Sequence, residues 1–186
     1  NKRLSVQECL DAVDECGAPV VSIPGGEPLI HKDIVQIVEG ILARKKFVYL
    51  CTNGLLLEKR LDKFSPSPYL TFSVHLDGLR EHHDLAVNQE GTFEIATRAI
   101  RKAKEMGFRV NVACTLFDQM SSEEAASFFD FCTNDLKVEG ITVSPGYAYE
   151  RAPDQDHFLS RRKTKQLFRD IFYFWIILFN VNFYTF

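Results

Sequence analysis

The chain has 186 residues, of which 46% are hydrophobic and 25% charged, and its formal net charge is −3. About 100–200 residues make one domain, so the length predicts one domain or part of a larger one. The composition excludes disordered and fibrous chains, and without a long basic run we expect no sequence-independent binding of nucleic acid.

An alternation of helices and strands runs through most of the chain. The predicted helices cover residues 5–16, 34–41, 55–64, 92–106 and 121–133, and the predicted strands cover residues 20–23, 47–50, 69–76, 109–116 and 140–144. Ser5 with Glu8, and Ser121 with Glu124, have the spacing of capping boxes, which start helices. Strands that alternate with helices in this way predict right-handed βαβ units and a parallel sheet.

The fold class is therefore α/β. A complete eightfold barrel takes about 250 residues, so we expect a partial (β/α) barrel with parallel strands and outer helices. The alternative is a small doubly wound sheet. In both architectures, functional groups gather where the strands end at their carboxyl side.

The composition changes near the C-terminus. No charged residue follows Asp170, and the apolar residues 171–179 are fewer than the roughly 20 that a membrane span needs. We divide the chain into a core domain, residues 1–170, and an aromatic tail, residues 171–186. The tail is either a buried final element or an aberrant end.

The first polar motif, Pro24-Gly25-Gly26-Glu27-Pro28, follows the first predicted strand. Two glycines allow positive φ angles and let a ligand approach the backbone closely. Exposed carbonyls together with the Glu27 carboxylate suit an ammonium group. A simple tight turn is the alternative interpretation.

The second motif, Cys51-Thr52-Asn53-Gly54, ends the next strand. Asn-Gly is a strong turn pair, and a cysteine at a strand end is usually a small buried hydrophobe. Cys51 is therefore either a packing residue or a reactive thiol.

Further polar side chains belong to the third and fourth predicted strands. Alternation places Ser73, His75 and Asp77 on one face, the lumen in a barrel, where they suit the hydroxyls of a ribose. The alternative is a strand with its polar side in water. Asn111, on the next strand, is either an interior amide or a ligand contact.

Two other groups are weaker candidates. His82 and His83 are adjacent, so they diverge by about 100° on a helix, and we expect a polar helix start and no metal site. Tyr147 and Tyr149 follow the last strand and form either an aromatic wall or ordinary packing. The chain has no phosphate-loop, zinc-protease or serine-hydrolase string.

Taken in order, these strings resemble the radical S-adenosylmethionine superfamily. The resemblance covers residues 4–170 and rests on Gly-Gly-Glu-Pro at 25–28, Thr-Asn-Gly at 52–54, Ser-Val-His-Leu-Asp-Gly at 73–78 and Gly-Thr-Phe at 91–93. More narrowly, residues 22–30, 47–53, 72–78 and 142–154 are similar to the adenosyl-hopene transferases of hopanoid lipid synthesis.

The resemblance implies two cofactors, a [4Fe–4S] cluster and S-adenosylmethionine. The cluster donates an electron to S-adenosylmethionine, which releases a 5′-deoxyadenosyl radical that adds to the alkene of hopene. It further implies cofactor contacts for Gly25, Gly26, Glu27, Pro28, Ser73, His75, Asp77 and Asn111, a substrate wall of Tyr147 and Tyr149, and Cys51 as the thiol that quenches the product radical. The implied partners are the apolar triterpene hopene and an electron donor.

One part of the pattern is absent. The superfamily holds its cluster with Cys-x-x-x-Cys-x-x-Cys, which none of the five cysteines forms. We expect that loop upstream of Asn1, so the chain is expected to be a fragment that is inactive alone. The alternatives are a different substrate, such as a peptide, and a cluster-less binding protein.

The expected location is the cytoplasm. The five cysteines lack the paired spacing of a secreted disulfide framework, and no signal peptide precedes the first helix. Because hopene resides in membranes, we also expect a peripheral membrane contact without a membrane span.

Overall fold

The computed structural model describes residues 4–147 and 158–179. Five strands form one sheet in the order β1-β2-β3-β4-β5, with every neighbouring pair parallel. The strands are β1 (Val20–Ile23), β2 (Phe47–Thr52), β3 (Leu70–His75), β4 (Arg109–Leu116) and β5 (Gly140–Pro145). The α-helices are α1 (Val6–Cys16), α2 (Ile34–Ala43), α3 (Arg80–Ala86), α4 (Thr92–Glu105), α5 (Ser122–Asp130) and α6 (Arg161–Phe179).

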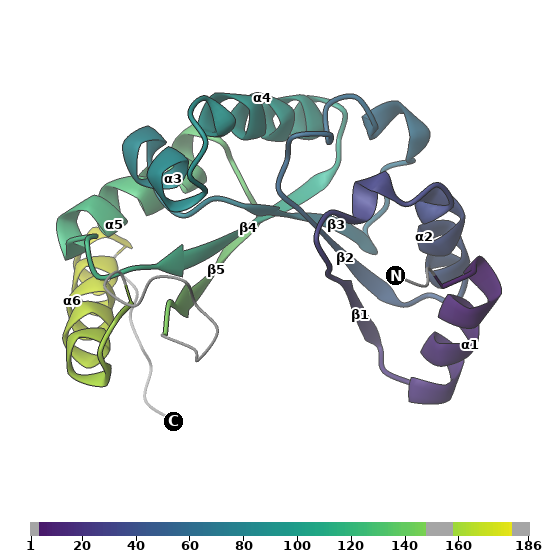
Figure 1. The fold of residues 1–186 in the computed structure, drawn as a ribbon, viewed down its shortest axis with the longest axis horizontal. Helices are drawn as coiled ribbons and strands as arrows, with labels where there is room; N and C mark the ends of the chain where they lie inside the picture. The colour runs from purple at the N-terminus through teal and green to yellow at the C-terminus, as the bar shows by residue number, and fades with distance from the viewer. Residues whose placement is uncertain (1–3, 148–157, 180–186) are drawn as a thin grey trace.

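The strand order is sequential, which confirms the partial barrel. A doubly wound sheet reverses its strand order at a switch point, and this sheet does not. The sheet curls into a half-barrel, and Figure 1 shows helices along its outer side while its concave side faces away from α4.

Both predicted capping boxes are present. The Ser5 hydroxyl accepts from the Glu8 N–H at 3.2 Å, and the Glu8 carboxylate accepts from the Ser5 N–H at 2.8 Å. Ser121 and Glu124 repeat the same pair of hydrogen bonds with the same distances. These bonds satisfy amide groups that a helix start leaves without partners.

The helix predicted over residues 55–64 is wrong. This connection consists of turns and a single 3₁₀ turn, Leu61–Lys63. Its hydrogen bonds run mostly from residue i+3 to residue i, as from the Arg60 N–H to the Leu57 carbonyl at 2.9 Å. The tighter winding still buries three apolar side chains in the core, namely Leu57, Leu61 and Phe64.

The two faces of the sheet differ in polarity. Along β4, every second residue from Val110 to Leu116 is buried, and the residues between them are half-buried. The buried side chains face the helices and form the core together with those of Leu70, Phe72 and Val74 from β3. The opposite, concave face carries mostly small and polar side chains together with the exposed Val20, Phe47 and Tyr49, so the core lies on the helical side of the sheet.

Helix α6 runs through the proposed boundary after Asp170. Leu167 and Ile171 from this helix lie in the core, on either side of that boundary. The division into residues 1–170 and 171–186 stays a prediction. Among the described helices, none is both long enough and apolar enough to span a bilayer.

The centre of the core gives the first testable prediction. Phe72 is 0% exposed and lies edge-on to Phe64 and Phe108, with ring centroids 5.5 and 5.2 Å away. We expect Phe72→Ala to lower the free energy of unfolding in urea by about 3–5 kcal/mol, because it removes apolar contacts and leaves a cavity. The matched control Phe47→Ala, at a ring that is 47% exposed, is expected to cost about 1 kcal/mol or less. Equal losses in the two variants would contradict this account of the core.

Candidate cofactor site on the concave face

The Glu27 carboxylate joins the two loops that follow β1 and β2. Its oxygens accept from the Leu29 N–H at 2.9 Å, the Asn53 N–H at 2.9 Å and the Thr52 hydroxyl at 2.9 and 3.0 Å. These partners come from segments about 25 residues apart in the sequence. The carboxylate therefore fixes the position of the glycine loop relative to the next loop along the rim.

The glycine loop itself is open. Gly25 has a φ of +144°, which side chains other than glycine rarely adopt, and a Cβ at Gly25 or Gly26 would meet nothing within 4 Å. No backbone N–H in the described part of the chain donates to either glycine carbonyl. Free carbonyls beside a negative carboxylate fit an ammonium group, which is the fit expected for the methionyl end of S-adenosylmethionine.

Three predicted site residues form a row across the sheet. The strand register pairs Cys51 of β2 with Ser73 of β3, and Ser73 with Asn111 of β4. Paired residues in register point to the same face, here the concave one. The row therefore places a thiol, a hydroxyl and an amide side by side.

The hydrogen bonds along this row differ. The Cys51 Sγ lies 3.5 Å from the Ser22 hydroxyl oxygen, on the neighbouring strand β1. The Asn111 side-chain N–H group donates to the Thr142 hydroxyl oxygen and to the Val112 carbonyl, both at 3.1 Å. The Asn111 donors are thus used within the protein, as the interior-amide interpretation expects.

His75 is held on the concave face by a buried carboxylate. Its Nε2 lies 2.7 Å from Asp77, whose side chain is 3% exposed and also accepts from the Thr115 N–H at 2.7 Å. The Asp77 N–H in turn donates to the Nδ1 of buried His83 at 3.2 Å. Asp77 is therefore fully engaged with the protein, whereas the His75 side chain remains 41% exposed.

The two histidines have opposite pKa shifts. The hydrogen bond that the His75 ring donates to the Asp77 carboxylate raises the pKa of His75, although burial opposes the shift. Burial lowers the pKa of His83, which favours the neutral ring whose Nδ1 accepts a hydrogen bond. On this face, His75 is thus the histidine whose charged form persists to a higher pH than that of an ordinary histidine.

The cysteines of the chain do not fit a [4Fe–4S] cluster. Cys114 and Cys132 are buried on the helical side, and burial raises the pKa of both thiols, that of Cys132 to about 12. Cys9 and Cys16 lie on α1, far along the chain from the Cys51 row. No three His, Cys, Asp or Glu side chains gather as a metal site among residues 4–147 and 158–173. Such a cluster needs several thiolates on one compact loop.

The structure describes two of the three remaining predicted site residues, Pro28 and Tyr147 but not Tyr149. Pro28 begins the 3₁₀ turn Pro28–Ile30 behind the glycine loop. Tyr147 follows β5 and is 47% exposed, while Tyr149 lies outside the described residues.

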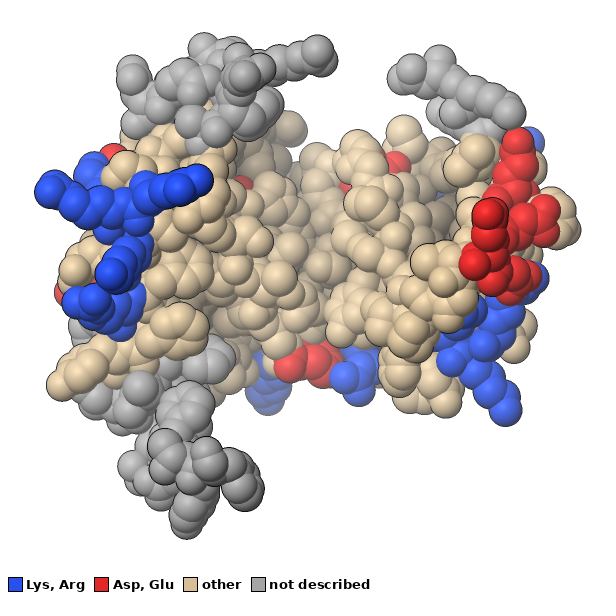
Figure 2. All heavy atoms as spheres, turned by 90° about the horizontal axis from the view of Figure 1, so that it is seen from below, with Lys and Arg blue, Asp and Glu red and all other residues tan. Residues whose placement is uncertain are grey.

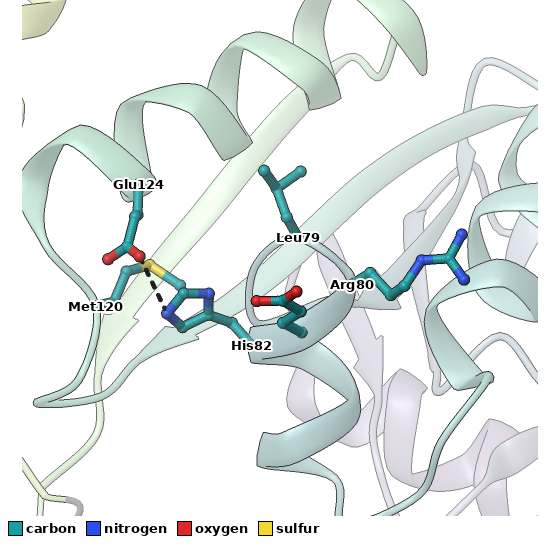
Figure 3. A pocket seen from close by; sticks show the side chains of 6 residues that line it. Leu79, Arg80, His82, Met120 and Glu124 are labelled. Carbon is teal, nitrogen blue, oxygen red and sulfur yellow. Dashed lines mark ion pairs between the residues drawn. The ribbon is translucent and has the colours of Figure 1, made fainter.

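A separate pocket of about 380 Å³ lies at the rim, away from this row of residues. It is lined by Leu79, Arg80, Glu81, His82, Met120 and Glu124, from the starts of α3 and α5. Figure 3 shows His82 pointing toward Glu124, with 3.7 Å between Nε2 and the nearest carboxylate oxygen, and Arg80 pointing elsewhere. None of the predicted site residues lines this pocket.

Sequence reasoning missed two contributors to the site. In the sequence, Thr52 belongs only to a turn motif and to the Thr-Asn-Gly string of the resemblance, and His83 belongs only to a polar helix start. Thr52 contacts Glu27, and buried His83 holds the Asp77 backbone. Alternation along β2 places Thr52 on the buried side with Val48 and Leu50, but no local pattern indicates that its partner is Glu27.

The fold and this face together define an α/β half-barrel domain with a candidate cofactor site at the carboxyl ends of its strands. A family model for the radical SAM superfamily matches residues 1–132, and the chain belongs to that superfamily. That superfamily uses S-adenosylmethionine and a [4Fe–4S] cluster as cofactors. A second model, a domain of unknown function (DUF3463), matches residues 141–184.

Individual relatives agree with this assignment. The chain is 25% identical over 151 residues to a GTP 3′,8-cyclase of Clostridium perfringens, covering 78% of this chain and 47% of the cyclase. It is 32% identical over 111 residues to the mycofactocin maturase MftC of Mycolicibacterium smegmatis, covering 58% of this chain and 28% of MftC. The chain thus spans less than half the length of these curated relatives.

A solved structure has the same fold. Streptococcus suis SuiB superposes with a TM-score of 0.81 at 18% identity, covering 98% of this chain and 42% of SuiB. The family model establishes the superfamily. Neither of the two curated relatives is named as a hopene transferase, so the narrower resemblance is not confirmed.

The His75–Asp77 pair gives the second prediction. The ordinary pKa of histidine is 6.5, and we expect His75 to titrate above it and His83 below it in an NMR titration of the ring signals. Stability from the His75 pair is present below pH 6.5 and is lost as pH rises through the raised pKa. Stability from neutral His83 is present above pH 6.5 and is lost as pH falls toward the lowered pKa.

The variant Asp77→Asn should bring the His75 pKa down, because it removes the partner charge. Asp62→Asn, at an exposed carboxylate in Leu61–Lys63, is the control and should leave both rings unchanged. A His75 ring that titrates identically in the Asp77 variant would refute the proposed pairing.

Proposed function

We propose that the whole protein is a radical S-adenosylmethionine transferase that adds a 5′-deoxyadenosyl group to the alkene of hopene, forming adenosylhopane. The observation that carries the cofactor assignment is the open glycine loop, fixed by Glu27 to Thr52 and Asn53 at the edge of a polar face. The bound cofactors supply the 5′-deoxyadenosyl radical, and this chain supplies the surface that orients them.

The proposal assigns roles to the glycine loop and to the polar residues on and just after β3. The free carbonyls of Gly25 and Gly26 receive the methionyl ammonium, and Glu27 positions them while adding a negative charge nearby. Ser73 and His75 hydrogen-bond the ribose from β3. Asp77 acts through His75 and is a positioning residue.

Apolar side chains on the same face support an apolar substrate. Val20, Phe47 and Tyr49 are 48%, 47% and 39% exposed, and alternation places them on the concave side with Cys51. The similarity of residues 22–30, 47–53, 72–78 and 142–154 to hopene transferases supports the particular substrate. Tyr147, which is 47% exposed after β5, is a further candidate for substrate contact, and the role of Tyr149 stays a prediction outside the described residues.

Cys51 is the hydrogen-atom donor in the proposed reaction. The new C–C bond uses one electron of the alkene π pair and leaves the other on the adjacent carbon. The Cys51 S–H bond breaks to give that carbon a hydrogen atom, and an electron and a proton from the external electron donor restore the thiol. No other cysteine lies on the concave side of the described strands.

A peptide substrate is the second candidate. It is favoured by the fold shared with Streptococcus suis SuiB, which has been solved bound to the precursor peptide SuiA and superposes with a TM-score of 0.75 at 19% identity. A protein that binds S-adenosylmethionine without cluster chemistry is the third, because the five cysteines of this chain do not fit the cluster.

The third prediction concerns cofactor binding by the chain itself. We expect equilibrium dialysis to detect bound S-adenosylmethionine and Gly25→Ala to weaken it at least about tenfold, because Ala strains a φ of +144° and moves the carbonyls. Gly107→Ala is the matched control. It has a φ of +85° and equally open surroundings, so it carries similar strain away from the site. Equal loss in both variants would show that strain alone, and not the loop, weakens binding.

The fourth prediction concerns the reaction of the whole protein. With its cluster reconstituted without oxygen, and with a reductant and hopene, mass spectrometry should find adenosylhopane. Cys51→Ala should lower the yield of adenosylhopane at least about tenfold while S-adenosylmethionine is still cleaved, because only the quenching step loses its donor. Cys16→Ala, at an exposed cysteine on α1, is the control. Wild-type yield from the Cys51 variant would exclude this thiol, and S-adenosylmethionine cleavage only with a peptide would exclude hopene.

A further inference from the structure

Helix α6 has one buried side and one exposed side. It packs against α5, and its residues Leu167 and Ile171 are in the core. At about 100° per residue, the exposed side chains up to residue 173 fall almost entirely within one arc of the helix, opposite these two. We name six of them the basic–aromatic face: Arg161, Arg162, Lys165, Arg169, Phe172 and Tyr173.

Charge and aromatic character are separated along this face. Its first part carries the four cations, and its second part carries Phe172 and Tyr173, which are 60% and 68% exposed. Figure 2 shows Lys and Arg side chains gathered at the end of the molecule where α6 lies.

Folding does not account for these cations. Among the described residues, Lys163 is the cation of α6 that forms an ion pair, with Asp118, and the four cations of the face have no such partner. Arg161 and Arg162 stand at the helix N-terminus, where the helix dipole disfavours positive charge, and no acidic residue occupies the first turn. The four cations of this face therefore remain available to an anionic partner.

We propose that the basic–aromatic face of α6 binds the surface of a membrane that contains anionic lipids. Lys and Arg attract lipid phosphates, while aromatic rings favour the interfacial region of a bilayer. No described helix spans a membrane, so α6 would lie along the interface with its buried side still on α5. The inference is compatible with an apolar membrane-resident substrate, but vesicle binding tests it without any turnover.

The fifth prediction is therefore measured by flotation of this chain with lipid vesicles. Vesicles of phosphatidylcholine with phosphatidylglycerol should carry the protein, and vesicles of phosphatidylcholine alone should carry much less. Because each cation contributes about a fivefold gain in binding, reversing two of them by Lys165→Glu with Arg169→Glu should weaken binding more than about 20-fold. Added salt should weaken binding by the wild-type chain, since it screens these charges.

Two further double variants distinguish an effect of the basic–aromatic face on vesicle binding from an effect of net charge. Lys45→Glu with Lys59→Glu changes the net charge equally at exposed positions on the opposite part of the fold and should bind like the wild type. Phe172→Gln with Tyr173→Gln keeps every charge and should still weaken binding, because it removes the rings that enter the interface. Equal binding to both vesicle types, or equal weakening by both charge reversals, would overturn the proposal. A dimer that hides the face, detected by light scattering, would overturn it as well.

Discussion

The Glu27 carboxylate is the interaction on which the candidate site depends. It accepts hydrogen bonds from the backbone of its own turn and from Thr52 and Asn53 in the next loop, so one ionised group sets the spacing of two loops on the sheet rim. Charge-assisted bonds of this kind are stronger than neutral ones, and three donors converge here. With the carboxylate used in this way, no backbone N–H among the described residues donates to the carbonyls of Gly25 and Gly26, which can meet a ligand. The Glu27 carboxylate thus fixes the glycine loop, and the backbone carbonyls of Gly25 and Gly26 are the groups that would contact a ligand.

A second carboxylate, that of buried Asp77, organises the other end of the face. Asp77 accepts from the Thr115 N–H and pairs with His75, while His83 holds the Asp77 backbone N–H. The outcome is one histidine with a raised pKa toward the concave side and one with a lowered pKa in the core. Each acidic side chain thus positions another group that can reach a ligand: Glu27 positions the glycine loop, and Asp77 positions His75. An open half-barrel needs such fixed groups, since its loops are not held by a closed ring of strands.

The two unequal faces of the sheet separate the core from the candidate site. The convex face buries a continuous apolar core against the helices, whereas the concave face keeps polar residues and the exposed Val20, Phe47 and Tyr49. The chain covers 47% of the GTP 3′,8-cyclase and 42% of SuiB that it matches. In our proposals the concave face meets cofactor and substrate, and the outer side of α6 meets a lipid surface.

The sequence by itself determined the elements and much of their order. Short runs of apolar and β-branched residues predicted all five strands, and two capping boxes predicted the starts of α1 and α5, because these signals act over a few neighbouring residues. It also placed Ser73 and His75 on one strand. Only the tertiary structure decided that Glu27 binds Thr52, that Asp77 is buried beneath His75, and that residues 55–64 form turns. Those outcomes depend on which segments the curvature of the sheet brings together, and contacts between residues 25 or more positions apart leave no local pattern.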